Sequence, residues 1–400
     1  MKIEKKYLIL NPVCVFVGTW LVVLLFDRIY GLALGEPFYP FSMSLLYLAV
    51  AVLLCWTAGF VCASFIPAPY FRVRNPFNLR KLASFYQTSR IFLACMLFAL
   101  VVIGADHFLW VGPGFLLPDG VMQYRIILTM EGGSPKFPWV SLFNFFFFFY
   151  PAFIASWAFS TERFRWPLFI AGLVCFCMFV YLSTARSAIF FPLLLTFFVI
   201  LQYKFRIRYF AYLFLLLFTL FGAIGALVGK AGFDKIFFYI LSPIHAFDLI
   251  FSGAIHYAPG FLSFRIFHPI LERLDIVQAS LVALDNINTP MPTNVFTVFG
   301  VYFLDYGLWG LLCFMFFFSF LSALVYYLAL YRHSPRTNVF CAMSYVLIVL
   351  GVFYDYYTST FFIFFAFFYI QLFFPQASTN HWKPCSRGNT QSALHTFHYK

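Results

Sequence analysis

Residues 294–310, NVFTVFGVYFLDYGLWG, open an apolar run that reaches Tyr331 and contains a single carboxylate, Asp305. An α-helix that crosses the hydrocarbon core of a bilayer needs about 20 apolar residues, and this run provides them. An acid within such a run costs free energy unless it lies at the membrane boundary or serves a function. The stretch therefore predicts a membrane helix with its outer boundary near Asp305.

The composition of the whole chain predicts the same environment. The 400 residues are 63% hydrophobic, 24% aromatic and 10% charged, whereas soluble proteins carry about 25% charged residues. Because backbone groups must be satisfied within lipid, the predicted fold class is an all-α polytopic membrane protein. About ten apolar windows have the required length; their limits are 7–26, 41–66, 91–111, 138–159, 167–183, 187–203, 209–229, 306–330, 338–353 and 359–374.

The distribution of charge predicts how the chain is threaded. With the N-terminus inside, the inner segments hold 18 of the 26 basic residues and two of the 14 acidic ones. Such an excess of Lys and Arg is typical of cytoplasmic loops, so the net charge of +12 requires no nucleic-acid partner. We expect one membrane domain over residues 1–400, with both termini cytoplasmic and a cytoplasmic tail at 375–400.

One outer segment, residues 230–305 between the seventh and eighth spans, is large. Within it, HPILERLDIVQASLVAL (268–284) repeats apolar residues at spacings of three and four, which predicts an amphipathic helix on the outer surface. A second helix is predicted to begin at 242–251, with Ser242 as its N-cap. The inner loops are too short for a nucleotide-binding domain, which needs upwards of about 100 residues, and no Walker sequence is present.

Three arginines are candidates for binding phosphate or diphosphate, since a guanidinium matches phosphate oxygens in a fork. Arg186 lies in YLSTARSAIF, between two short predicted spans; its structural alternative is a loop arginine that snorkels to the interface. Arg265 and Arg273 lie in SFRIFHPILERL in the large loop. Arg265 has the same alternative, and Arg273 could instead pair with an acid on its own helix.

Three acids and one histidine are candidates for a general base. Asp305 could cap a helix that begins at residue 306, or point into an outer cavity, and the two roles are compatible. Asp355 lies in FYDYYTST, beside Tyr354; this combination suits a sugar-binding surface or an ordinary interfacial belt. Asp248 and His268 are further candidates. The histidines are too widely spaced for a metal motif and no D-x-D pair is present, so no metal and no cofactor are expected.

Three features together resemble the bacterial oligosaccharide repeat-unit polymerases, the O-antigen polymerase (Wzy-type) family. They are STARSAIFF after a short span, one large late outer loop, and TPMPTNVFTVFGVYFLDYGLWG at 289–310. The family pattern near the end of the loop is Asn–x–x–Thr, aromatic residues, Asp–aromatic–Gly and a further glycine. The matching positions are Asn294, Thr297, Tyr302, Phe303, Asp305, Tyr306, Gly307 and Gly310, and an arginine–serine pair matches Arg186 and Ser187.

The resemblance implies a membrane glycosyltransferase of lipopolysaccharide biosynthesis, multi-pass in the bacterial inner membrane. It would transfer a growing glycan from undecaprenyl diphosphate to the next lipid-linked repeat unit at the periplasmic face, without a metal. Its partners would be these lipid-linked oligosaccharides, membrane lipids, and the chain-length regulator and flippase of the same pathway. The implied substrate-binding residues are Asn294, Thr297, Tyr302 and Tyr306, and Tyr354 is added to them because its aromatic ring lies next to Asp355 in the sequence.

Two alternatives stay open. An O-antigen ligase would use the same donor with the lipid A core as acceptor, on a similar fold. A lipid-linked oligosaccharide flippase or a solute transporter would place charges at mid-membrane and would break helices at paired positions. The predicted spans hold few charges near their centres, which favours a site at the outer face and therefore the polymerase.

Overall fold

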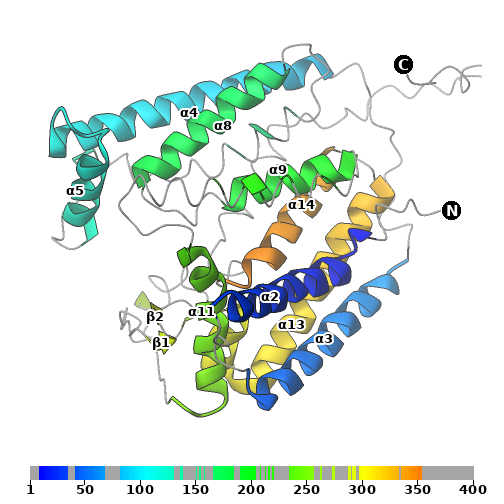
Figure 1. The fold of residues 1–400 in the computed structure, drawn as a ribbon. Helices are drawn as coiled ribbons and strands as arrows, with labels where there is room; N and C mark the ends of the chain where they lie inside the picture. Colours follow the sequence, from blue (N-terminus) through cyan, green and yellow to red (C-terminus); the bar gives the residue numbers. More distant parts are fainter. Residues whose placement is uncertain are drawn as a thin grey trace, which may run out of the picture.

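In its described residues, the computed structural model of the chain contains helices and one short hairpin (Figure 1). The residues that it describes are 9–34, 41–67, 82–129, 136–137, 150, 153–154, 157, 165–183, 190–203, 208, 212, 215–216, 219, 234–255, 262–263, 273–274, 287–289, 291–293, 297–332 and 335–353. The helices are α2 (Pro12–Leu34), α3 (Met43–Ser64), α4 (Leu82–Val111), α5 (Pro118–Thr129), α8 (Arg165–Ser183), α9 (Phe190–Tyr203), α11 (Asp234–Phe251), α13 (Val298–Arg332) and α14 (Pro335–Leu350). The antiparallel strands are β1 (Ile287–Thr289) and β2 (Met291–Thr293), with Ile287 opposite Thr293.

Four of these helices contain stretches long and apolar enough to cross a membrane: Pro12–Ile29, Met43–Ser64, Ser89–Val111 and Val298–Tyr331. The chain is therefore a helical membrane protein, as its composition predicts. Seven of the ten predicted spans coincide with helices of the described ranges. The other three, 138–159, 209–229 and 359–374, lie wholly or mostly outside those ranges. The number of ten spans, the inner and outer sides and the cytoplasmic tail stay predictions.

Helices α3 and α13 form the longest packed pair and run side by side in the same direction (Figure 1). At Gly59 the backbones approach so closely that an added Cβ atom would lie 2.3 Å from the carbonyl oxygen of Phe316. The ring of the next residue, Phe60, packs against Tyr326 and Tyr327. A glycine at the crossing lets two membrane helices approach in the way that small residues commonly do.

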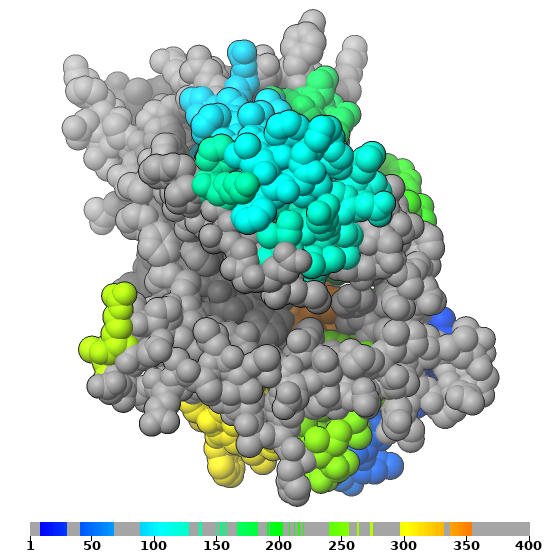
Figure 2. Space-filling model, turned by 90° about the vertical axis from the view of Figure 1, so that its left-hand side faces the viewer, coloured from blue at the N-terminus to red at the C-terminus, as the bar shows by residue number. Residues whose placement is uncertain are grey.

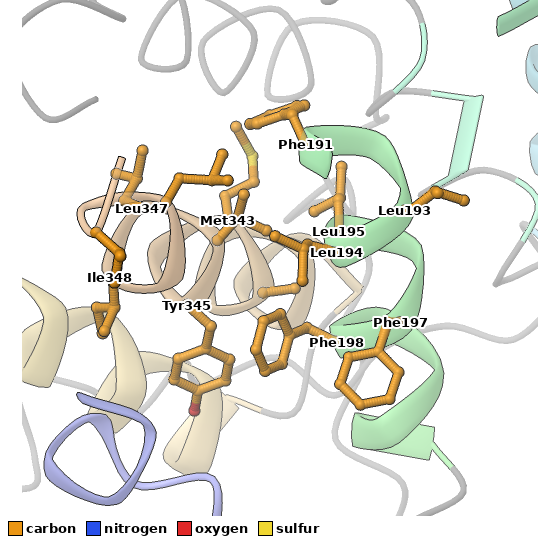
Figure 3. Close-up of a cluster of buried hydrophobic side chains, with 14 of the residues drawn as sticks. Phe191, Leu193, Leu194, Leu195, Phe197, Phe198, Met343, Tyr345, Leu347 and Ile348 are labelled. Carbon is orange, nitrogen blue, oxygen red and sulfur yellow. The ribbon is translucent and has the colours of Figure 1, made fainter. Parts of the chain in front are cut away.

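Helices α9 and α14 bury a second apolar layer, in which Phe198 and Tyr345 face one another at 5.1 Å between ring centroids (Figure 3). The Tyr345 hydroxyl is fully buried and donates a hydrogen bond to the carbonyl oxygen of Leu10, just before α2. A buried hydroxyl needs a partner of this kind. The bond therefore fixes α14 against the beginning of α2.

Helices α4, α5 and α8 form a separate group at the top of Figure 1. The Tyr181 hydroxyl of α8 donates to the carbonyl oxygen of Leu116 at 2.9 Å, which joins α8 to the turn before α5. Helix α5 was not among the predicted elements, because its 12 residues are too short and too polar to resemble a span.

Several helix ends meet at one place, which we call the polar end: the end of α2, the starts of α3 and α13, and α11. The end of α14 is joined to it, since the backbone N–H of Val298 donates to the carbonyl oxygen of Gly351 at 2.8 Å. The ring of Phe353 in turn stacks on Phe190, the first residue of α9. In Figure 2, segments of α3, α11 and α13 form the lower edge of the molecule, with α4 and α5 above.

Helix α11 corrects one prediction. It begins at Asp234, so Ser242 is a buried interior residue instead of an N-cap, and Pro243 lies inside the helix. A proline there lacks one N–H donor and weakens the helix locally, but an apolar face with Ile244 and Phe247 buried compensates by packing. Of the predicted amphipathic helix at 268–284, only residues 273–274 are described.

Candidate functional site

Asp305 binds the backbone of a distant segment. Its Oδ1 accepts the N–H of Leu262 at 2.9 Å, and its Oδ2 accepts the N–H groups of Leu262 and Ser263 at 3.0 and 2.5 Å. The carboxylate therefore does not cap a helix that begins at residue 306, as the capping hypothesis required. Helix α13 begins at Val298, and the N-cap role belongs to Thr297, whose Oγ1 accepts the N–H of Gly300 at 3.4 Å.

The residues after Asp305 complete this anchor. Tyr306 shares a hydrogen bond with Ser263, at 2.8 Å between the two hydroxyl oxygens. Gly307 then interrupts α13 with φ 68° and ψ −169°, a conformation that essentially only glycine adopts. Past the break, a Cβ atom on Gly310 would lie 2.1 Å from the Cβ atom of Tyr306. Each member of the Asp–Tyr–Gly–x–x–Gly pattern thus has a physical reason for its identity.

Asp248 of α11 makes a second anchor. Its Oδ2 accepts the N–H of Ser42 at 2.8 Å, and its Oδ1 accepts the hydroxyl of the same residue. The Ser42 oxygen accepts in turn from the N–H of Leu45 at 3.1 Å, so it is the N-cap of α3. Asp248 is 7% exposed, and its carboxylate fixes α11 to the first turn of α3.

His245 lies one turn earlier on the same face of α11. Its Nε2 is 3.4 Å from Oδ1 of Asp27 in α2, and its ring stacks on Phe41 with centroids 4.8 Å apart. Burial lowers the pKa of His245 to about 4, so the imidazole is neutral near pH 7. The contact with Asp27 is then a hydrogen bond from a neutral ring, and the predicted outer helix is tied to both α2 and α3.

The described sugar-binding candidates differ in access. Thr297 and Tyr302 are fully buried, and Tyr302 stacks on Phe314 at 4.3 Å within the helix packing. Tyr306 is 38% exposed. Among these three residues only Tyr306 can meet a substrate without rearrangement of the core.

The diphosphate candidates are barely represented in the described ranges. Arg273 is exposed. Six predicted site residues lie outside those ranges: Arg186, Arg265, His268, Asn294, Tyr354 and Asp355. Their roles stay predictions. Phe190, four residues after Arg186, and Phe353, just before Tyr354, stack with their ring centroids 5.5 Å apart.

A further polar cluster, which the sequence analysis did not identify, lies where α4 ends. Asp106 is fully buried and accepts from the Tyr124 hydroxyl at 2.5 Å and from the N–H of Phe137 at 2.8 Å. Burial and the bond to Asp106 raise the pKa of Tyr124, which keeps its proton on the hydroxyl. The sequence signal was the same as for Asp305, a carboxylate near the end of an apolar run.

Within the described parts of the chain, no three His, Cys, Asp or Glu side chains lie together as metal ligands would. Comparisons of the chain with known protein families, with curated proteins and with solved structures found no match. At the polar end lie two carboxylates occupied by backbone and hydroxyl donors, a neutral buried histidine and an accessible tyrosine.

Proposed function

We propose that this chain is an oligosaccharide repeat-unit polymerase of the O-antigen type. It transfers a growing glycan from undecaprenyl diphosphate to the next lipid-linked repeat unit at the periplasmic face of the bacterial inner membrane. The proposal draws on the sequence resemblance over 289–310 and around Arg186. It is supported by the geometry of the anchor that this same segment builds.

The observation that carries the proposal is the bonding of Asp305 to the N–H groups of Leu262 and Ser263. These two residues are followed closely in the sequence by Arg265 and His268, the candidates for diphosphate binding and for the base. The Asp–Tyr–Gly turn thus holds the beginning of that segment beside α13. In this proposal Asp305 is a positioning residue, because both of its oxygens are already occupied.

The reaction assigns a task to each remaining candidate. The bond between the anomeric carbon of the donor glycan and the diphosphate oxygen breaks, and a new bond forms from that carbon to an acceptor hydroxyl oxygen. Arg186, Arg265 and Arg273 would stabilise the charge on the departing undecaprenyl diphosphate. The hydroxyl proton would pass to Asp355 or His268, since Asp248 is engaged by Ser42. Tyr306 would contact the sugar.

The experiment that tests the proposal is a lipopolysaccharide gel from a strain without the gene. A polymerase predicts loss of the ladder with a core carrying one repeat unit retained, and restoration by the wild-type chain. Loss of all O-antigen, including the single repeat, would instead indicate a ligase or a flippase. Purified protein with lipid-linked repeat units gives the direct confirmation, because a polymerase alone lengthens the glycan on the lipid carrier.

A further inference from the structure

A narrow apolar cavity of about 320 Å³ lies between α2 and α3, below the polar end. Its floor is made of buried side chains, among them Val23 and Val52. Phe41, Phe247 and Thr297 also line it. Phe41 is the ring that stacks on His245, so the cavity adjoins the polar contacts of α11.

The cavity opens sideways. Its rim includes Leu21 and Leu24 of α2 and Leu46 and Val50 of α3, and all four side chains are exposed. Both helices contain stretches able to cross a membrane. In a bilayer the opening would therefore face hydrocarbon, and only the hydrocarbon part of a lipid can enter from that side.

The size of the cavity suits one hydrocarbon chain. Along α3 the lining residues run from Leu45 to Leu53, which is about 12 Å of helix at 1.5 Å per residue. A volume of about 320 Å³ over that length suits a segment of a single hydrocarbon chain. Common phospholipids carry two acyl chains, whereas a polyprenyl phosphate has one methyl-branched chain.

The cationic side chain of Arg28 lies beyond the outer part of the rim. Leu21, Leu24 and Arg28 are spaced three and four residues apart on α2, so they lie on one face of the helix. Arg28 is exposed and lies about one turn past Leu24, towards the polar end. A guanidinium at this level suits the phosphate of a lipid whose chain occupies the cavity.

We propose that the cleft between α2 and α3 holds the chain of a polyprenyl phosphate, with the phosphate at Arg28. The proposal rests on the proposed function for the identity of the lipid, and it deepens that function by giving the carrier a binding site. The site would hold the carrier beside α11 and the start of α13, whose residues Phe247 and Phe299 line the cavity.

The test is photolabelling of the full-length protein in vesicles of phosphatidylglycerol and phosphatidylethanolamine. The probe is a polyprenyl monophosphate with a diazirine in its terminal isoprene unit, and labelled peptides are identified by mass spectrometry. We expect label on the lining segments of α2 and α3. Ala49→Trp, which fills the cavity from its rim, should reduce labelling about tenfold or more, a change of about 1.4 kcal/mol in binding.

A matched control is Ala58→Trp, on an exposed alanine of the same helix that does not line the cavity; its labelling should equal that of the wild type. Leu46→Trp provides a second block should Ala49→Trp fold poorly. Arg28→Gln should weaken labelling by the phosphate probe but not by the corresponding polyprenol. Label outside the segments that line the cavity, equal labelling of Ala49→Trp and Ala58→Trp, or a fall in labelling as the phosphatidylglycerol fraction of the vesicles is raised would overturn the proposal.

Failure of this site and failure of the proposed function give different results. Labelling requires binding but no turnover. If the probe labels the cleft, and a strain without the gene still makes the full glycan ladder, only the polymerase proposal is refuted. A chain that lengthens glycans in purified form, and whose Ala49→Trp variant labels and polymerises normally, refutes only the cleft. Absence of both activities refutes both.

Discussion

Two aspartates, Asp106 in α4 and Asp305 in α13, bind backbone N–H groups of connecting segments in different surroundings. Asp106 is fully buried and accepts one hydroxyl and one N–H from the corner formed with α5. Asp305 is half-buried and accepts three bonds from a segment about 43 residues away. Both acids resemble intramembrane charges in the sequence, yet both lie near a helix end and hold a connection in place.

The two aspartates differ in exposure: Asp106 forms a closed structural anchor, and Asp305 forms an anchor beside the candidate site. The Asp106 cluster is closed, because Tyr124 covers it and stacks on His107. The Asp305 anchor is open on one side, where Tyr306 reaches solvent and the helix breaks at Gly307. A connection that must stay ordered beside a substrate needs an anchor that leaves the surface free. Substitutions at the two positions should therefore differ in their balance of stability and activity.

The largest effect on stability is expected for Asp106→Ala. It would leave the Tyr124 hydroxyl and the Phe137 N–H buried without an acceptor, at a cost of about 3 kcal/mol. Thermal unfolding in detergent, followed by size-exclusion chromatography, measures the change. Tyr124→Phe removes only one partner and should cost about 1 kcal/mol. Equal melting temperatures for Asp106→Ala and the wild type would show that the corner is held by its apolar contacts alone.

Asp305→Asn should cost less, about 2 kcal/mol, and should disturb function more. An amide can offer only one acceptor oxygen, and its NH₂ group would face an N–H donor of Leu262 or Ser263. We expect hydrogen exchange at these two amides to accelerate about tenfold or more, together with loss of glycan polymerisation. Tyr306→Phe is the matched control, because it removes the bond to Ser263 Oγ and leaves the amides protected. Unchanged exchange in Asp305→Asn would remove the positioning role.

The comparison also shows what sequence patterns can supply. Apolar length predicts α3, α8 and α14 to within a few residues, since lipid fixes both the length and the composition of a span. It misplaces the start of α13 by eight residues, because it treats Asp305 as the boundary. The chain in fact bends at Gly307, one residue past the predicted limit of 306. The partners of Asp305 and Asp248 are some 43 and 206 residues away, and no local period encodes such contacts.

Gly307→Ala tests whether the break in α13 is needed to keep the anchor open. At φ 68° and ψ −169° an alanine is strained, although its Cβ would meet no atom within 4 Å, so we expect a loss of about 1.5 kcal/mol from backbone strain alone. Gly18→Ala in α2, where an added Cβ also meets nothing, should be neutral or stabilising. Similar melting temperatures for the two variants would mean that α13 can straighten at this position.

The smallest expected effect is the pH dependence of stability, which tests how α11 is anchored beside the open site. The pKa of His245 is lowered by burial to about 4 in the folded chain, while the unfolded chain has a pKa of about 6.5. Well above pH 6.5 the ring is neutral in both states, so it adds no pH dependence to the free energy of unfolding. Between pH 6.5 and 4 the unfolded chain binds a proton that the folded chain does not, so stability falls as the pH is lowered. At pH 5.5 the loss should be about 1 kcal/mol, visible as a lower melting temperature.

His245→Asn keeps a polar side chain without this titration and should flatten the dependence of melting temperature on pH between 6.5 and 4. An unchanged slope in His245→Asn would assign the pH dependence to other groups, and α11 would then be held chiefly by Asp248 and Ser42.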